Sequence, residues 1–384
     1  MNSTRVYLDN AATTPLLPAV REAMEPYLNG SYGNASSPYA VAREARMALD
    51  GARTRVARLI GANPDEIAWT GSGTEADNWA LLGIALAHFS ERGHFIVSAV
   101  EHHALLESAQ TLRELGFEVE FAPATAEGIV EPETIERLLR PDTRLVSLMS
   151  CNNEIGVRQP VAQVARLCRE RGVTFHVDAT QSAGKEALDV DFAVANGTDG
   201  GCDLMTISAH KIGGPKGAGA LYIRRGTKMK PLLRGGAQER GRRAGTENVA
   251  AIAGFGEAAR LALENLEPNI AHLKALQSRL DEGLKILSGV EIVAENVSRA
   301  PHITSFLVKG KRAESLALNL DLRGFAVGTG SACASGALEP SHVLAAMGYS
   351  RDEARSVLRI SLGGHNTQSD VDDFVNELGH LLQK

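Results

Sequence analysis

Short apolar runs alternate with longer segments of helical periodicity along most of the chain. Amphipathic helices are predicted, for example, at residues 74–90 and 161–172. Strands alternating with helices predict βαβ units and a mostly parallel sheet covered on both faces, with ligands at the carboxyl ends of the strands. Seven runs have the length and composition of strands: EIAWT, HFIVSAV, EVEFAPA, RLVSLMS, VTFHVDA, DLMTISA and GALYIRR.

The character of the chain changes near Pro268. Residues 264–287 have the periodicity of a long helix, and the pattern TQSD at residues 367–370 caps a helical C-terminus. Between these two helices lie three further runs that we expect to form strands: VEIVAE, HITSFLV and RGFAVGT.

These two patterns predict an α/β fold with two domains. The large domain, residues 13–258, is expected to contain the seven-stranded sheet. A smaller α+β domain is expected to consist of residues 1–12 together with residues 259–384, with the first dozen residues packed on it.

The composition narrows the class of protein. The chain has 384 residues, of which 44% are hydrophobic, so it is long enough to bury a large core. Its net charge of −6 is mild, and the sequence lacks the basic stretch of a protein that binds nucleic acid directly. The start, MNSTRVYLDNAATT, has no apolar core of a secretion signal, and the longest apolar run, WALLGIALAHF, is too short to span a bilayer. We therefore expect a cytoplasmic protein without membrane contact.

The four cysteines are not spaced as a disulfide framework or a zinc site, so we expect no metal. Cys151, Cys168 and Cys202 lie in or beside apolar patterns and are expected to be buried as small hydrophobic residues. Cys333 differs because it lies in VGTGSACASGALEP, among small residues that do not bury a thiol. This cysteine therefore requires a chemical explanation.

The stretch TGSGTEADN, Thr70–Asn78, lies between a predicted strand and a predicted helix. Small residues at a helix start let backbone N–H groups approach a phosphate, and the helix dipole favours the negative charge. Gly71, Gly73 and Ala76 also match the dinucleotide fingerprint G-x-G-x-x-A. An ordinary tight turn is a third interpretation, and this motif alone does not decide among them.

Two further strand ends carry charged residues. Asp178 ends the strand in FHVDATQSAG, where it either caps the next segment or pairs with a protonated ring nitrogen. Lys211 follows a strand beside Ser208 and His210. Lys216, in the glycine-rich turn that comes next, is expected to be an ordinary solvated lysine. A strand-end aspartate followed by a strand-end lysine suits pyridoxal phosphate, with the lysine for the imine and the aspartate for the pyridinium nitrogen. Together with the phosphate-type helix start, this order favours that cofactor over hydride transfer.

With these motifs in place, the chain resembles the cysteine desulfurases of the NifS/IscS type, in the class V branch of the fold-type-I enzymes that use pyridoxal phosphate. The resemblance covers nearly the whole length. It rests on these segments: YLDNAATTP, TGSGTEADN, VEHHALLES, NNEIGV, HVDATQS, SAHKIGGPKG, RRAGTEN, GSACASGALEPSHVL and LRISLG.

The resemblance implies a cofactor role for each matching residue. Lys211 would bind pyridoxal phosphate as an imine, Asp178 would pair with the pyridine nitrogen, and Gln181 would donate toward the phenolic oxygen. His102 would stack on the ring, with His103 as the alternative. The phosphate would be held by Gly73, Thr74, Ser208, His210 and, from the other subunit of a homodimer, Thr246.

The resemblance also implies the substrate and the reaction. Asn153 and Arg359 would bind the carboxylate of L-cysteine, a task suited to a bidentate guanidinium. The Cys333 thiolate would take the sulfur as a persulfide, leave L-alanine, and pass the sulfur to an acceptor protein, either an iron–sulfur scaffold or a thiolation enzyme. The glycines expected to give its loop backbone freedom are Gly328, Gly330 and Gly336.

The loop around Cys333 matches the NifS/IscS group rather than the SufS-like group. The sequence departs from the family in GNASSPYA, where Ala35 replaces proline and Tyr39 replaces a common histidine, so a substrate role of Asn34 or Tyr39 stays open. The C-terminus, ELGHLLQK, lacks the longer tail of IscS-type members, so iron–sulfur cluster assembly is supported less than the reaction itself.

Four alternatives stay open on the sequence alone. Selenocysteine lyase activity, or another aminotransferase or lyase reaction, would use the same fold and cofactor. A docking module without turnover would need none of Lys211, Asp178, His102 and Cys333. A nicotinamide dehydrogenase would be purified without visible absorption.

Overall fold

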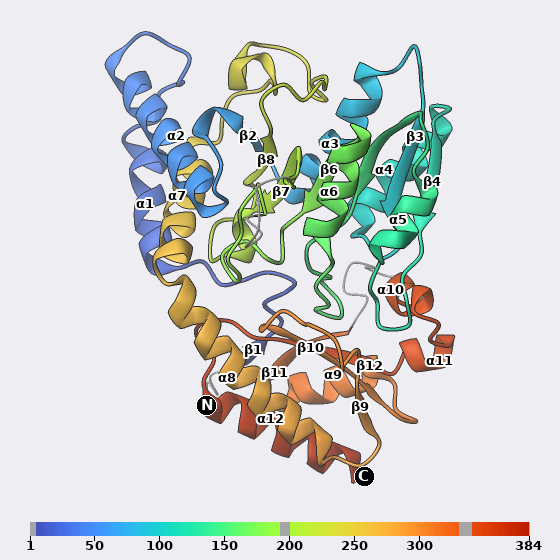
Figure 1. Ribbon diagram of the computed structural model, residues 1–384. Helices are drawn as coiled ribbons and strands as arrows, with labels where there is room; N and C mark the ends of the chain where they lie inside the picture. Colours follow the sequence, from blue (N-terminus) through green and yellow to red (C-terminus); the bar gives the residue numbers. More distant parts are fainter. Residues whose placement is uncertain (1–4, 193–199, 330–339, 384) are drawn as a thin grey trace.

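The computed structural model describes residues 5–192, 200–329 and 340–383 and contains two sheets, one above the other in Figure 1. The larger sheet has seven strands in the order β2-β8-β7-β6-β5-β3-β4. Only β8 runs antiparallel to its neighbours in this sheet. The seven strands are β2 (Ile67–Thr70), β3 (His94–Ser98), β4 (Glu118–Ala122), β5 (Thr143–Ser147), β6 (Thr174–Asp178), β7 (Leu204–Ser208) and β8 (Gly219–Ile223), as the sequence pattern predicts.

The strands of this sheet are apolar on both faces because helices cover both faces. Phe95 and Val97 of β3 pack in one hydrophobic cluster with α3 (Gly73–Ala87) and α4 (His103–Glu114). The intervening Ile96 belongs to the cluster on the opposite face, since side chains alternate along a strand. That opposite face is covered by α2 (Ala40–Leu59), α5 (Pro132–Leu138) and α6 (Val161–Arg171).

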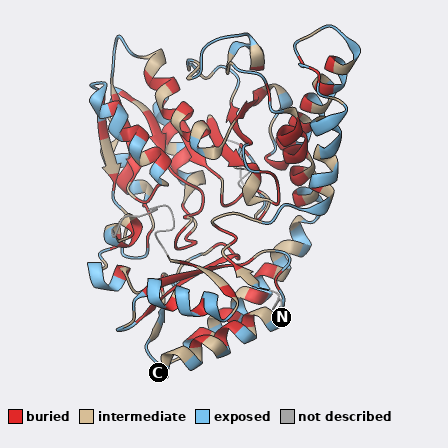
Figure 2. Ribbon diagram, turned by 180° about the vertical axis from the view of Figure 1, so that it is seen from behind, coloured by how far each residue is buried: buried red, intermediate tan, exposed pale blue. Residues whose placement is uncertain are grey.

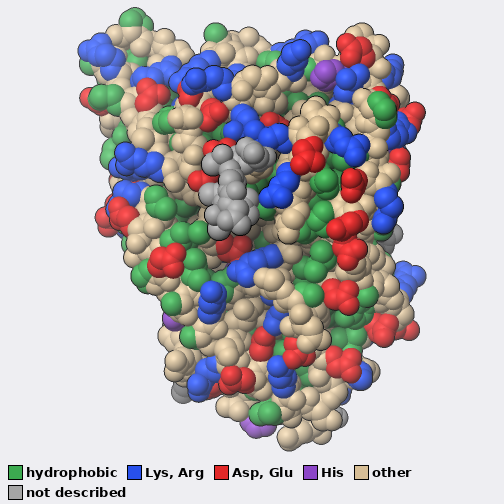
Figure 3. Space-filling view, viewed as in Figure 1, with side chains coloured by type: hydrophobic (Ala, Val, Ile, Leu, Met, Phe, Trp, Pro, Cys, Tyr) green, Lys and Arg blue, Asp and Glu red, His purple; other side chains and the backbone are tan. Residues whose placement is uncertain are grey.

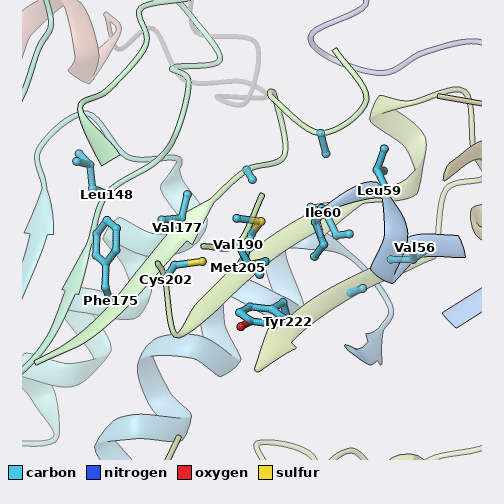
Figure 4. Packing of buried hydrophobic residues seen from close by; sticks show 14 of the residues in the cluster. Val56, Leu59, Ile60, Leu148, Phe175, Val177, Val190, Cys202, Met205 and Tyr222 are labelled. Atoms are coloured by element: carbon cyan, nitrogen blue, oxygen red, sulfur yellow. The ribbon is translucent and has the colours of Figure 1, made fainter. Parts of the chain in front are cut away.

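Figure 4 shows part of this second cluster, in which Val56, Leu59 and Ile60 lie near Tyr222 and Met205 of the sheet. Figure 2 shows the result for the whole molecule, with buried strands in the centre and exposed residues on the outer sides of the helices. The mostly parallel, doubly covered sheet predicted from the sequence is therefore confirmed.

Helices α1 (Pro18–Asn29), α2 and α7 (Val249–Glu264) pack together beside the large sheet. The close approach of α2 and α7 depends on Gly256, because a Cβ on this residue would lie 2.5 Å from Ala52 Cα. The predicted boundary between residues 258 and 259 falls within α7, and the division into domains stays a prediction.

The smaller sheet has five strands in the order β1-β11-β12-β10-β9. Its first strand, at residues 6–8, pairs in parallel with β11, so the predicted packing of the N-terminus on this part of the molecule is confirmed. The strands are β1 (Val6–Leu8), β9 (Val290–Ile292), β10 (Ile303–Val308), β11 (Phe325–Thr329) and β12 (Val357–Ser361). Of these, β9, β10 and β11 agree with the predicted strands, whereas the sequence interpretation left β12 unassigned.

Helices α8 (Leu266–Lys285), α9 (Ala313–Leu322) and α12 (Gln368–Leu382) contribute buried leucines to the core beside this sheet. The predicted cap of α12 is present, since the Thr367 side chain accepts from Asp370 N at 3.2 Å. Two short helices, α10 (His342–Ala346) and α11 (Arg351–Ala354), precede β12.

Three of the four cysteines, Cys151, Cys168 and Cys202, are buried, as predicted. Burial raises the pKa of each of these thiols, so they stay protonated and unreactive. Cys333 lies outside the described residues.

Figure 3 shows acidic and basic side chains interspersed on the viewed face, in keeping with the mild net charge. Within the described ranges, no helix combines the length and the apolar content needed to cross a bilayer.

Replacement of Phe175 tests the packing of the large core. This side chain is fully buried in the cluster of Figure 4, so Phe175→Ala is expected to lower the free energy of unfolding by about 3–5 kcal/mol. The measurement is urea unfolding. The control is Leu322→Ala on α9, at a position that is 86% exposed, where a change within about 0.5 kcal/mol is expected. Equal losses in the two variants would contradict this account of the core.

Candidate active site

A cavity of about 420 Å³ lies at the carboxyl ends of β2, β6 and β7. Arg359 of β12, in the small sheet, also lines it. The three motifs singled out in the sequence therefore meet in one place, as the topology of a parallel sheet requires. The predicted site residues that line the cavity are Gly73, Thr74, His102, Asn153, Asp178, Gln181, Ser208, His210, Lys211 and Arg359.

The first strand end forms an anion cradle at the start of α3. Ser72 caps the helix by accepting from Glu75 N at 3.1 Å, and Gly73 follows as the first helical residue. Gly73 packs closely here, since a Cβ on it would lie 3.4 Å from Ser208 Cβ and 3.5 Å from Thr180 Oγ1. The Ser208 hydroxyl is buried without a hydrogen-bond partner among the described residues. A helix start beside an unpartnered hydroxyl suits a phosphate group.

His210 adds a neutral polar group to this cradle. Its Nδ1 lies 3.1 Å from Thr13 Oγ1, and burial, followed by the charges of Lys211 and Lys216, lowers the pKa of His210 to about 4. At neutral pH the imidazole is therefore uncharged and serves as a hydrogen-bonding group rather than as a counter-charge.

Asp178 is the last residue of β6 and is buried at the floor of the cavity. Its Oδ1 accepts from Thr180 N at 2.9 Å, so it organises the turn that follows the strand. The nearby Asp77 is fully buried, and burial together with the charge of Asp178 raises the pKa of Asp77 well above its usual value. Burial therefore favours the protonated form of Asp77. Asp178 lies beside it at the strand end and lines the cavity, a position that suits a partner for a cationic ring nitrogen.

Lys211 ends a short 3₁₀ turn after β7, the strand next to β6. Its Nζ donates to the carbonyl oxygens of Ala11 at 2.5 Å and Ala12 at 2.8 Å. The Ala11 carbonyl also accepts from Gln181 Nε2 at 2.9 Å. The segment after β1 therefore crosses to the large sheet and holds two of the predicted cofactor residues.

The two adjacent histidines have different environments. His102 is half-buried at the start of α4, and its Nδ1 accepts from Ala104 N at 3.1 Å. Burial lowers the pKa of His102, with Asp178 and Lys211 acting on it in opposite directions. His103 is exposed and its ring lies 4.5 Å from that of His342, centroid to centroid. Both line the cavity, and the predicted choice of His102 is in keeping with the charges of Asp178 and Lys211 that act on it.

Arg359 projects from β12 and is only 2% exposed. Its Nη1 donates to the Asn153 carbonyl at 2.8 Å, and its Nη2 forms an ion pair with Asp9 Oδ1 at 2.8 Å. Gly328 lies opposite in β11, where a Cβ would be 2.8 Å from Asp9 Oδ1 and 3.0 Å from Arg359 Nη2. The expectation that Gly328 loosens a loop is therefore wrong, because this glycine is a strand residue that leaves room for an ion pair.

Sequence reasoning missed several acidic residues at this site. Glu154 lines the cavity, accepts from the Ser341 hydroxyl, and has its pKa raised to about 7 by burial. Glu101, which precedes His102 in the sequence, is fully buried, and burial raises its pKa to about 8. Asp9 pairs with Arg359. All three lie inside segments that carried the resemblance, and for Asp9 the signal was a carboxylate directly after an apolar strand.

One described site residue, Thr246, lies apart from this cavity. Thr246 is exposed and is not among the lining residues, as its assignment to a second subunit would require. Cys333 lies outside the described residues. Cys151 does line the cavity, but its Sγ is buried and lies 3.5 Å from the Gly156 carbonyl.

The residues present fit pyridoxal phosphate. Lys211 and Asp178 follow adjacent strands, and the anion cradle with the unpartnered Ser208 hydroxyl lies at the same edge of the sheet. This combination defines a fold-type-I enzyme that depends on pyridoxal phosphate.

Comparison with known proteins narrows this class. Residues 6–374 match the aminotransferase class-V family, and the chain belongs to that family, whose members use pyridoxal phosphate. Within the family it belongs with the cysteine desulfurases. The chain is 43% identical to cysteine desulfurase IscS of Dictyoglomus turgidum over 99% of its own length and 95% of that protein. The resemblance found in the sequence is confirmed.

Solved structures agree with this placement. A NifS-like protein superposes with a TM-score of 0.90 at 36% identity, over 99% of both chains. A structure described as SspA in complex with cysteine superposes with a TM-score of 0.81 at 32% identity, over 94% of this chain and 100% of that one. The predicted fold class is therefore confirmed.

Glu154 makes the free energy of unfolding depend on pH. Its pKa is about 7 in the folded chain, above its ordinary value of 4.5, because burial disfavours the ionised carboxylate. Between pH 4.5 and 7 this carboxyl ionises more readily in the unfolded chain than in the folded one, so the folded state loses stability as the pH rises. Glu154→Gln keeps an acceptor for Ser341 and never ionises. Its free energy of unfolding is expected to exceed that of the wild type by about 1–3 kcal/mol at pH 8 and to approach it at pH 5.

The measurement is urea unfolding of both proteins at the two pH values. Glu127→Gln, at an exposed position, is the control and should leave the pH dependence unchanged. A larger gain from Glu154→Gln at pH 5 than at pH 8 would contradict the buried-acid explanation.

Proposed function

We propose that this protein is a cysteine desulfurase that converts L-cysteine to L-alanine, takes the sulfur on Cys333 as a persulfide, and passes it to an acceptor protein. The observation that carries the proposal is the convergence of Lys211, Asp178 and Arg359 on one cavity, with the phosphate cradle beside them. The similarity to cysteine desulfurase IscS of Dictyoglomus turgidum, over 99% of this chain and 95% of that protein, supports the choice of substrate.

The cofactor residues divide the binding of pyridoxal phosphate among them. The N–H groups at Gly73 and Thr74 and the side chains of Ser208 and His210 would hold the phosphate. Asp178 would hold a proton on the ring nitrogen, and Gln181 would donate to the phenolic oxygen. When bound in this way, the cofactor supplies an electron sink for the carbon atoms of the substrate.

Lys211 Nζ would move the proton at the substrate's Cα. The carbonyl oxygens of Ala11 and Ala12 hold this amine near the cavity, and a held amine keeps its position while it takes and returns a proton. His102, whose pKa is lowered by burial, would be a neutral imidazole against the ring face. Lys211 would thus supply the base, and His102 would contribute an uncharged ring surface to the same site.

Arg359 would bind the substrate carboxylate, with Asn153 beside it. Arginine suits this role because its planar guanidinium presents several N–H donors and stays charged. The solved complex of SspA with cysteine, at 32% identity, supports an amino-acid substrate of this size.

Cys333 would carry the sulfur, since the three described cysteines are buried and have raised pKa values. Its thiolate attacks the sulfur of bound L-cysteine, so an S–S bond forms while the substrate's Cβ–S bond breaks. The electron pair of the broken bond stays with the carbon, which takes a proton to give L-alanine. The products are one alanine and one persulfide, so atoms and electrons balance.

Thr246 would complete the phosphate site of a second subunit, which makes the active form a homodimer. Its exposure on the chain surface, outside the chain's own cavity, supports this assignment.

The acceptor protein would be a scaffold for iron–sulfur clusters or a thiolation enzyme, in the cytoplasm. Selenocysteine lyase activity is the second candidate, because the same groups would act on a selenium atom.

Replacement of Cys333 tests the sulfur carrier. The Cys333→Ala variant, loaded with cofactor, is expected to stay yellow and bind L-cysteine but to lose sulfur transfer and persulfide formation. The measurements are alanine release from L-cysteine and the persulfide mass on the intact protein. Cys168→Ala, a buried thiol away from the cavity, is the control and should keep both signals. Full turnover by Cys333→Ala would rule out the carrier role.

Replacement of Lys211 tests the cofactor attachment and the proton step. Borohydride treatment of loaded wild-type protein is expected to fix the cofactor covalently, whereas Lys211→Ala should retain none after denaturation. Alanine formation should fall by about 10²–10⁴-fold, the usual contribution of a general acid–base group. Lys216→Ala, at an exposed lysine nearby, is the control and should keep the covalent label. A label that persists in Lys211→Ala would place the attachment elsewhere.

A further inference from the structure

We propose that Asp9 is a positioning residue for the substrate carboxylate and acts by holding the Arg359 guanidinium in its binding orientation. This inference rests on the proposed function, because it assigns Asp9 a task in amino-acid recognition by Arg359. Asp9 does not line the cavity, so its action goes through the arginine.

The guanidinium is held at two points. Asp9 Oδ1 accepts from Nη2 and the Asn153 carbonyl accepts from Nη1, each at 2.8 Å, on different nitrogens of one rigid plane. Two fixed points on a plane define its orientation, whereas one leaves it free to swing. The Nε–H of Arg359 is buried and has no partner among the described residues, so this donor is not used by either of the two contacts.

Asp9 is itself fixed by the strand that precedes it. It forms a parallel bridge with Ser361, two residues beyond Arg359 in the sequence, and its carbonyl accepts from the Tyr7 hydroxyl at 2.9 Å. The carboxylate therefore has a set position relative to β12. Because Asp9 bridges to Ser361 and Arg359 belongs to the same strand, both partners of the ion pair are anchored on β12.

Gly328 supports this interpretation from the third strand. A side chain there would come within 3.0 Å or less of both Asp9 Oδ1 and Arg359 Nη2. The absence of a side chain at this β-strand position leaves the space in which the pair forms. Three strands, β1, β11 and β12, thus cooperate to present one guanidinium to the cavity.

The same segment links the carboxylate site to the cofactor lysine. Two and three residues after Asp9, the carbonyls of Ala11 and Ala12 accept from Lys211 Nζ. Residues 9–12 therefore contact both Arg359, through the Asp9 carboxylate, and Lys211, through the carbonyls of Ala11 and Ala12. This segment sets the distance between the arginine and the lysine that an amino-acid substrate would contact.

The test compares Asp9→Ala and Asp9→Asn with the wild-type holoenzyme. Asp9→Ala is expected to raise the KM for L-cysteine about tenfold, with kcat within about twofold, because a charge-assisted hydrogen bond that orients the arginine is lost. Asp9→Asn keeps an oxygen that accepts from Nη2, so its KM should stay close to that of the wild type. A purely structural role would not produce this separation of KM from kcat with rescue by asparagine.

A matched control removes a comparable ion pair from the same part of the molecule. Asp281 pairs with Arg299, and the two side chains are 17% and 8% exposed, against 19% and 3% for Asp9 and Arg359. Asp281→Ala is expected to lower the melting temperature without raising the KM. An equal rise of KM in Asp281→Ala would overturn the proposal, as would an unchanged or lower KM in Asp9→Ala.

Binding without turnover gives a second readout. Calorimetry of the holoenzyme with L-alanine should show about tenfold weaker binding to Asp9→Ala, whereas L-alaninamide, which lacks the carboxylate charge, should bind both proteins alike. Should Asp9→Ala not fold, Gly328→Ala displaces the same pair from the opposite side and is expected to weaken L-alanine binding in the same way. Equal weakening for L-alaninamide would overturn the proposal. Failure of the proposed function would instead appear in the wild type, as an absence of alanine formation.

Discussion

The burial of charge at the junction of the two sheets is the constraint on which the site depends. Burying a charged group is costly unless the group is paired and hydrogen-bonded. The terminal nitrogens of the buried Arg359 are bonded to Asp9 and the Asn153 carbonyl, and the partly buried Lys211 amine donates to the carbonyls of Ala11 and Ala12. Both solutions use the segment that follows β1, which explains why the N-terminus crosses from the small sheet to the carboxyl edge of the large one.

The parts of the site that were predictable from sequence are those set by local pattern. Asp178 and Lys211 each follow an apolar run, and the carboxyl ends of neighbouring parallel strands meet at one edge whatever lies between them. The start of α3 was recognisable for the same reason, since small residues after a strand signal a helix N-terminus. All seven strands of the large sheet followed from hydrophobic periodicity because helices bury both of its faces.

The parts that were not predictable depend on pairing across long sequence distances. Strand β12 was left unassigned because Arg359, a charged residue, interrupts its apolar pattern. The partners that make its burial acceptable, Asp9 and the Asn153 carbonyl, lie 350 and 206 residues away in the sequence. Gly328 looked like a source of loop freedom because its reason, the space for this ion pair, lies on two other strands. Buried acids such as Glu154 were missed because sequence alone does not show that a carboxyl is enclosed.

Most of the other titratable groups around the cavity are kept uncharged by burial. Burial lowers the pKa of His102, of His210 to about 4 and of His342 to about 4, and it raises the pKa of Glu101 to about 8. These groups therefore contribute hydrogen bonds without net charge near neutral pH. In the proposed function, Arg359 binds the substrate carboxylate among groups that contribute hydrogen bonds rather than charge. The burial that requires Asp9 beside Arg359 would then also let this arginine determine how the substrate lies.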